Sequence, residues 1–94
     1  METKLAVFKG KGILKTLYKN EWWFSVTDVI GALTDSTNPR DYWLKMKIRV
    51  KNEAGAELST ICRQLKLKSS DGKKYETDCA NTEGVFRIIQ SIPS

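Results

Sequence analysis

The chain has 94 residues, and its 16 Lys and Arg against 11 Asp and Glu give a formal net charge of +5. This length suits one domain, and a hydrophobic fraction of 40% excludes wholesale disorder. No apolar run is long enough to cross a membrane as a helix, and the start of the chain has too few apolar residues for a secretory signal. We therefore expect a cytoplasmic protein without membrane contact, and the basic balance points weakly to nucleic acid.

The sequence also excludes most catalytic chemistry. It contains no histidine, which removes the commonest general base and metal ligand, and no phosphate-binding or nucleophile motif. The two cysteines, Cys62 and Cys79, lack zinc-site spacing, and we expect them to be free thiols. We therefore expect no enzyme, no cofactor and no metal site.

The first 25 residues predict an antiparallel meander of three strands. Strands are expected at residues 5–8, 13–19 and 22–24. The turns between them are expected at Gly10 and Gly12 and at Asn20–Glu21. On the third strand Trp22 and Phe24 share one face and Trp23 takes the other, because neighbouring side chains alternate. Base stacking is one reading of these aromatics, but we favour packing in the core.

Two helices are predicted next. Thr27 is expected as the N-cap of a short helix that ends near Asp35. Asn38 caps a second and longer helix that starts at Pro39 and ends at about residue 53. Such a pair has the outline of a helix-turn-helix, although many packed helix pairs share it.

The second helix has an apolar arc between two basic flanks. Tyr42, Trp43, Met46 and Val50 fall in the arc, Arg40, Lys47 and Lys51 on one flank, and Lys45 and Arg49 on the other. These basic residues either contact phosphates or form an ordinary solvated face. If they bind DNA, we expect Lys47→Glu combined with Lys51→Glu to weaken binding with little effect on the melting temperature.

A β-hairpin is predicted from residue 65 to residue 79. A three-residue loop, Ser70–Gly72 with Gly72 left-handed, pairs Leu67 with Tyr75 and Leu65 with Thr77, which keeps apolar residues on one face. Lysines then gather at its tip and polar face: Lys66, Lys68, Lys73 and Lys74. Lys68 lies opposite Lys74, so either a bound phosphate relieves their repulsion or the lysines protect an edge strand from aggregation.

A last helix is expected to start after Asn81 or Thr82. Its apolar side consists of Val85, Phe86, Ile88 and Ile89. Because little of the chain follows to cover this side, we expect the 94 residues to be one domain taken from a longer protein.

Several of these segments resemble one known family. Trp23–Val29, followed by Ala32–Leu33, is similar to the W-F-x-x-x-D-V and A-L opening of the N-terminal domain of the BRO family. This family takes its name from baculovirus repeated open reading frames and includes phage antirepressors. Asn38–Asp41 and Thr82–Ser91 are similar to later parts of the same pattern, whereas Thr34–Asp35 departs from it.

The resemblance implies a DNA-binding domain of a phage or prophage regulator. We expect an α+β fold in which a small antiparallel β-sheet with a lysine-tipped hairpin packs against two or three helices. Double-stranded DNA is the expected partner, bound by Arg40, Lys45, Lys47, Arg49, Lys51, Lys66, Lys68, Lys73 and Lys74. Two alternatives stay open: a module that binds a phage repressor or another acidic protein, and a homodimer whose final helix completes its core in trans.

Overall fold

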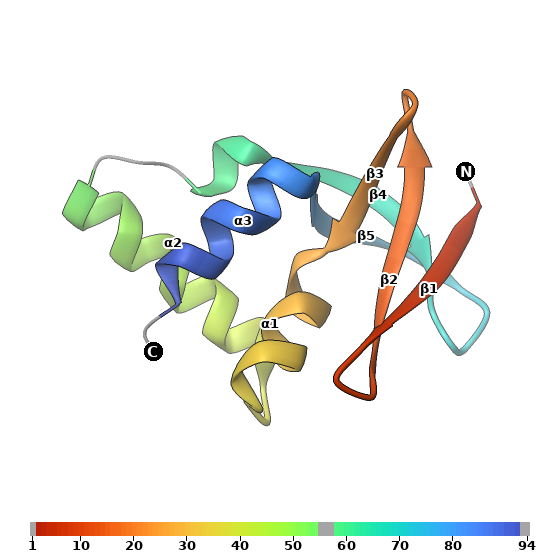
Figure 1. Cartoon of the computed structure of the whole chain (residues 1–94), viewed down its shortest axis with the longest axis horizontal. Helices are drawn as coiled ribbons and strands as arrows, with labels where there is room; N and C mark the ends of the chain where they lie inside the picture. Colours follow the sequence, from red (N-terminus) through yellow and green to blue (C-terminus); the bar gives the residue numbers. More distant parts are fainter. Residues whose placement is uncertain (1, 55–57, 93–94) are drawn as a thin grey trace.

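The computed structural model describes residues 2–54 and 58–92, which form one antiparallel sheet and three α-helices (Figure 1). The elements in chain order are β1 (Thr3–Phe8), β2 (Lys11–Tyr18), β3 (Glu21–Ser25), α1 (Val26–Thr34), α2 (Pro39–Ala54), a 3-10 turn (Leu58–Ile61), β4 (Cys62–Lys68), β5 (Lys74–Ala80) and α3 (Thr82–Ser91). The five strands lie in the order β1-β2-β3-β5-β4. The α+β fold is therefore confirmed.

The predicted meander is present, but both of its turns are shifted. The first turn is Lys9–Gly10 and the second is Lys19–Asn20, and all four residues have positive φ between 51° and 76°. Two-residue turns of this left-handed kind match the twist of a hairpin, so the strands continue up to them. Gly12 therefore lies inside β2 opposite Val7, and Glu21 belongs to β3, so the expected turn positions were wrong.

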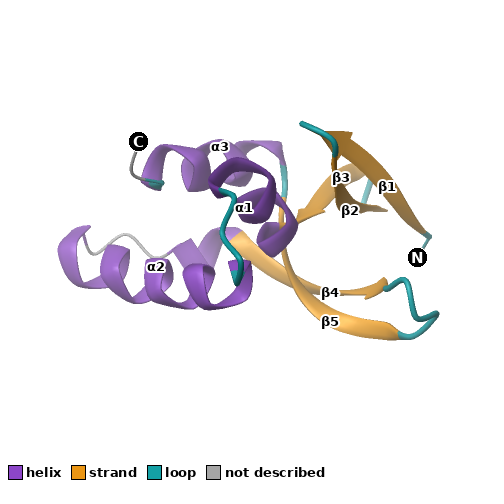
Figure 2. Ribbon diagram, turned by 90° about the horizontal axis from the view of Figure 1, so that it is seen from below, coloured by secondary structure: helices purple, strands orange, loops and turns teal. Residues whose placement is uncertain are grey.

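The sheet folds over between the meander and the hairpin of β4 and β5. β3 and β5 pair only at Phe24–Ala80 and Ser25–Cys79, so the hairpin is free to turn across the meander (Figure 2). Leu65, Leu67 and Cys79 pack inside this fold against three residues of the meander: Leu14, Tyr18 and Trp23. These contacts pack the hairpin against the meander.

The junction of β3 and α1 differs from the sequence prediction. Ser25, not Thr27, is the N-cap, because its hydroxyl accepts a hydrogen bond from the Asp28 amide at 3.5 Å. The Asp28 carboxylate accepts the backbone N–H of Leu14 at 3.0 Å. At this point β3 has already become helix, so Asp28 satisfies an amide of β2 that has lost its neighbouring strand.

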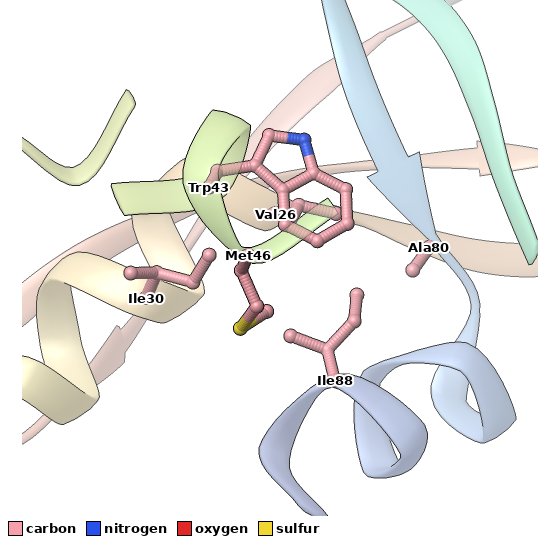
Figure 3. Close-up of a cluster of buried hydrophobic side chains, with 6 residues drawn as sticks. All are labelled: Val26, Ile30, Trp43, Met46, Ala80 and Ile88. Carbon is pink, nitrogen blue, oxygen red and sulfur yellow. The ribbon is translucent and has the colours of Figure 1, made fainter. Parts of the chain in front are cut away.

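The core between the helices is built around Trp43. Its indole is 2% exposed and packs with Met46 of α2, Val26 and Ile30 of α1, Ala80 of β5 and Ile88 of α3 (Figure 3). Trp43 and Met46 confirm the predicted apolar arc of α2, and Tyr42 packs at its border. The side chain of Val50 lies outside the described residues.

The hairpin has the predicted register. Leu65 pairs with Thr77, Leu67 with Tyr75, and Lys68 with Lys74. The Ser69 amide donates to the Lys73 carbonyl at 2.8 Å, which closes the three-residue loop. Gly72 has a φ of 87°, the left-handed conformation that this loop requires.

α3 covers the core with only part of its apolar side. Asn81 caps it by accepting the Gly84 amide at 2.9 Å, and Ile88 is fully buried. Phe86 and Ile89 stay 61% and 39% exposed, so part of the predicted apolar side is uncovered. They face outward because the part of α3 that meets α1 and the sheet is the side that carries Val85 and Ile88.

Candidate nucleic-acid interface

The outer face of the hairpin is basic. Lys66 and Lys68 alternate with buried leucines along β4, so they point to the opposite side of the strand. Lys74 stands opposite Lys68 on the same face, and Lys73 lies in the turn. Within the described part of the chain, none of these four exposed lysines forms an ion pair, although Glu76 lies opposite Lys66. The structure therefore brings the four predicted hairpin residues together.

Asp71 fixes the tip of the hairpin. Its carboxylate accepts the hydroxyl of Tyr75 at 2.6 Å and the amide of Lys73 at 2.8 Å. The hydrogen bond from Tyr75 is the main reason that the pKa of Asp71 lies below its ordinary value, and the same bond raises the pKa of Tyr75. The lysines beside the tip therefore lie next to a turn that is stabilised by side-chain hydrogen bonds as well as by backbone hydrogen bonds.

A groove separates the hairpin from α2. It encloses about 450 Å³, and Arg40, Leu44 and Lys47 of α2 line one wall while Gln64 and Glu76 line the other. Arg40 is exposed at this groove. The groove lies between one basic flank of α2 and the hairpin, and it is lined by Arg40 and Lys47 but by none of the four hairpin lysines.

Asp78 lies at the floor of the groove and accepts hydrogen bonds from three side chains. Asp78 Oδ2 accepts the Trp43 indole N–H at 2.8 Å and the Lys47 ammonium at 3.2 Å, and Oδ1 accepts the Gln64 amide at 3.3 Å. Burial opposes ionisation of Asp78, but the hydrogen bonds from Trp43 and Lys47 outweigh it and hold the pKa of Asp78 below its ordinary value. We call Asp78, Trp43, Lys47 and Gln64 the Asp78 cluster.

This cluster changes the role of Lys47. Its side chain is 26% exposed and already neutralises Asp78, which is 20% exposed. Lys47→Glu would place two carboxylates together, so the double variant with Lys51→Glu is now expected to lower the melting temperature. This replaces the expectation that the double variant would spare stability. The side chain of Lys51 lies outside the described residues.

The other basic flank of α2 faces away from the groove. Lys45 pairs with Asp41 at 3.0 Å, one turn earlier in the helix. Arg49 donates from Nη2 to the carbonyl of Ser91 at 3.0 Å, near the end of α3. Lys45 and Arg49 are therefore separated from the hairpin lysines, and the nine predicted residues do not form a single patch.

The structure also shows basic residues that the sequence reading overlooked. The Arg63 guanidinium lies 5.0 Å from the ring centre of Tyr18 and 5.7 Å from that of Trp23. The Lys15 ammonium lies 4.2 Å from the ring centre of Trp22. Strand alternation could have placed Lys15 on the face of Trp22, but the stacking of Arg63 depends on the folding of the sheet. In these cation–π contacts, the charged groups of Arg63 and Lys15 pack on the aromatic rings of the meander, which is a structural role.

Residues 2–54 and 58–92 contain neither a membrane-spanning helix nor a cluster of metal ligands. No helix there has both the length and the apolar character that crossing a membrane requires. No group of three cysteine or acidic side chains in those residues is arranged to hold a metal ion. Cys62 and Cys79 are free, as predicted, and burial raises the pKa of each thiol to about 12.

The model of the BRO family, N-terminal domain, matches residues 13–94. No curated protein and no solved structure matches the chain. Because the match covers most of the chain, the protein belongs to the BRO family through this N-terminal domain.

Proposed function

We propose that this domain is a non-catalytic DNA-binding module of an antirepressor-type transcription regulator from a phage or prophage. Its outer hairpin face and the adjoining flank of α2 contact double-stranded DNA. Family membership supports this class of function, since the resemblance to phage antirepressors implies DNA binding. The choice of surface is our inference from charge and exposure.

The observation that carries the proposal is the pairing of Lys68 with Lys74. Like charges directly opposite each other destabilise an antiparallel pair, and no acidic side chain forms an ion pair with either lysine among the described residues. A phosphate between the two ammonium groups would relieve this repulsion. The rigid tip held by Asp71 keeps both lysines in place for such a contact.

The flank of α2 gives the surface its second side. Arg40 is exposed across the groove from the hairpin and can contact a phosphate or the edge of a base. Lys47 supports this surface from below by neutralising Asp78. We therefore assign phosphate contacts to Lys66, Lys68, Lys73 and Lys74, a direct contact to Arg40, and a supporting position to Lys47.

Fluorescence anisotropy with a random-sequence duplex and its single strand tests the proposal. Each phosphate that the protein neutralises adds about 0.9 to the slope of log affinity against log salt. Lys68→Gln with Lys74→Gln removes the contact with the phosphate between them and should therefore reduce the slope by about 1 and weaken duplex binding at about 50 mM salt. The matched control, Lys9→Gln with Lys19→Gln, removes two exposed lysines from the other turns and should leave the slope unchanged.

Three results would count against the proposal. Equal slopes for the two double variants would show that net charge, not the hairpin, drives binding. Absence of duplex binding at low salt would overturn DNA binding by this domain. Preference for the single strand would leave the surface in place but contradict the duplex as its partner.

One observation favours a second candidate function, the capture of a repressor protein. Leu44 and Ile48 on α2 are 48% and 63% exposed, next to basic residues. Such a mixed face suits an amphipathic or acidic protein surface. Binding of this kind would respond far less to salt than phosphate contacts do, and Ile48→Ala would weaken it while leaving DNA affinity unchanged.

A further inference from the structure

β1 is an edge strand that carries exposed apolar side chains on both faces. Among residues 2–54 and 58–92 it pairs with β2 alone, and no strand of those residues pairs with its other edge. Leu5 and Val7 are 61% and 69% exposed on one face, and Phe8 is 45% exposed on the other. Edge strands usually avoid this composition, because an open apolar edge recruits another strand.

An apolar groove continues from β1 across to α3. It encloses about 350 Å³ between Phe8 of β1, Ile13 and Phe24 of the sheet, Leu33 of α1, and Phe86 and Ile89 of α3. The exposed side of α3 is therefore not isolated, because it forms the far wall of a surface that begins at the edge strand. We call β1 and this groove the β1 face.

The exposed apolar area of the β1 face is large for a domain of 94 residues. Its main contributors are Leu5, Val7, Phe8, Phe86 and Ile89. With roughly 150–250 Å² for a large apolar residue, their exposed fractions amount to on the order of 500 Å². This is more than half of the about 800 Å² that each partner contributes to a stable protein interface. The backbone of the open edge and the groove walls add to it.

We propose that the β1 face binds the same face of a second copy of this chain, with the two β1 strands antiparallel about a two-fold axis at Ala6. In this register Leu5 of each copy lies opposite Val7 of the other, and Lys4 lies opposite Phe8. Apolar side chains are buried on both sides of the sheet only in a register that places residues of the same face opposite each other. The register centred on Ala6 is of this kind, and it pairs residues 4–8 of the two copies.

The rest of the fold is compatible with this pairing. Thr3 lies outside the paired residues and keeps its hydroxyl as the acceptor of the Lys68 amide, at 2.9 Å. From this point β1 and the hairpin diverge, so residues 4–8 stay accessible (Figure 2). A strand of the second copy that pairs along the open edge contacts side chains on both faces of β1, which a helix or a loop lying on one face would not do.

Sedimentation velocity from about 10 to about 500 μM tests the proposal, because the chain has a mass of 10.7 kDa and a dimer has twice that. Val7→Lys should raise the dimer dissociation constant at least about 10-fold by placing a charge at the centre of the interface. The matched control is Leu17→Lys, which adds the same charge at a 49% exposed position on β2 and should dimerise like the unchanged chain. A monomer at every concentration, or a Val7→Lys dimer of unchanged affinity, would overturn the proposal.

A second variant tests the register without depending on the folding of Val7→Lys. Ala6→Cys places two cysteines opposite each other on the two-fold axis, within reach of a disulfide. Mild oxidation should then give a covalent dimer, while the unchanged chain, with Cys62 and Cys79 only, controls for the native thiols. Failure of Ala6→Cys to crosslink more than the unchanged chain would overturn the proposed register.

Discussion

Replacing Asp78 by alanine should strongly destabilise the domain. The change removes the acceptor of the Trp43 indole N–H, which lies in the helical core, and the anion beside Lys47. A buried donor without a partner costs about 1–3 kcal/mol, and the loss of a hydrogen bond to a charged group adds to this. We expect the free energy of unfolding to fall by about 2–4 kcal/mol, out of roughly 5–14 kcal/mol for a chain of this length.

Thermal unfolding followed by circular dichroism measures this effect. A loss of this size lowers the melting temperature of a small domain by roughly 10–25 °C. Asp35→Asn is the control, because it also removes a carboxylate bonded to a lysine, at 2.6 Å, but from an 86% exposed side chain. This control should melt like the unchanged chain. An Asp78→Ala variant within about 2 °C of the control would refute the structural role of the Asp78 cluster.

The pH dependence of Asp78→Asn separates charge from hydrogen bonding. The pKa of Asp78 in the folded chain lies below its ordinary value, so the ionised carboxylate stabilises the fold above the unfolded pKa of about 3.9. This contribution is lost as the pH falls below 3.9 through the lower folded value. The difference in stability between the unchanged chain and Asp78→Asn should therefore have its full size near pH 7 and disappear as the pH falls below about 3.9. A difference that stays constant with pH would contradict the charge effect.

Three further outcomes are expected. Lys68→Glu replaces a cross-strand repulsion with an attraction, so it should stabilise the free domain by about 0.2–1 kcal/mol in urea denaturation. The same variant should weaken duplex binding. A less stable variant would contradict the repulsion between Lys68 and Lys74. Ser25→Ala should lower the free energy of unfolding by about 0.5–2 kcal/mol and Thr27→Ala by less, because Ser25 is the N-cap; equal losses would contradict this assignment. Cys62 and Cys79, with pKa values raised to about 12, should react slowly with a thiol reagent at pH 8 in the folded chain and quickly in urea; fast reaction of the folded chain would contradict their burial.

The parts of the fold that sequence predicts well are governed by local rules. The hairpin register followed from strand alternation and from the need for a left-handed glycine at residue 72, and both are found in the structure. Pro39 and Asn38 likewise marked the start of α2 through capping rules that act within one turn. The turn at Lys19–Asn20 was misplaced by one residue, because a lysine with positive φ is not a strong sequence signal.

The parts that sequence missed depend on contacts between distant segments. Trp43 and Asp78 are 35 residues apart, and only the fold shows that Lys47 is held by Asp78 rather than free in solvent. The charge pattern of α2 could identify its two flanks but not which flank meets the hairpin. Helix periodicity likewise places Phe86 on one apolar side of α3, but only the fold shows how much of that side the neighbours cover.

Apart from Arg40, which lies in the Asn38–Asp41 segment, the family motif and the candidate interface occupy different parts of the molecule. Trp23 and Phe24 pack on opposite sides of the meander, and Asp28 binds the Leu14 amide where β3 ends. Gly84 is equally structural, because a Cβ there would lie 3.0 Å from the Ala80 side chain. These motif residues fix the fold, whereas the hairpin lysines lie outside the motif segments. Family membership therefore supports the scaffold more directly than it supports any individual contact, and the contacts proposed for the hairpin lysines rest on their charge and exposure.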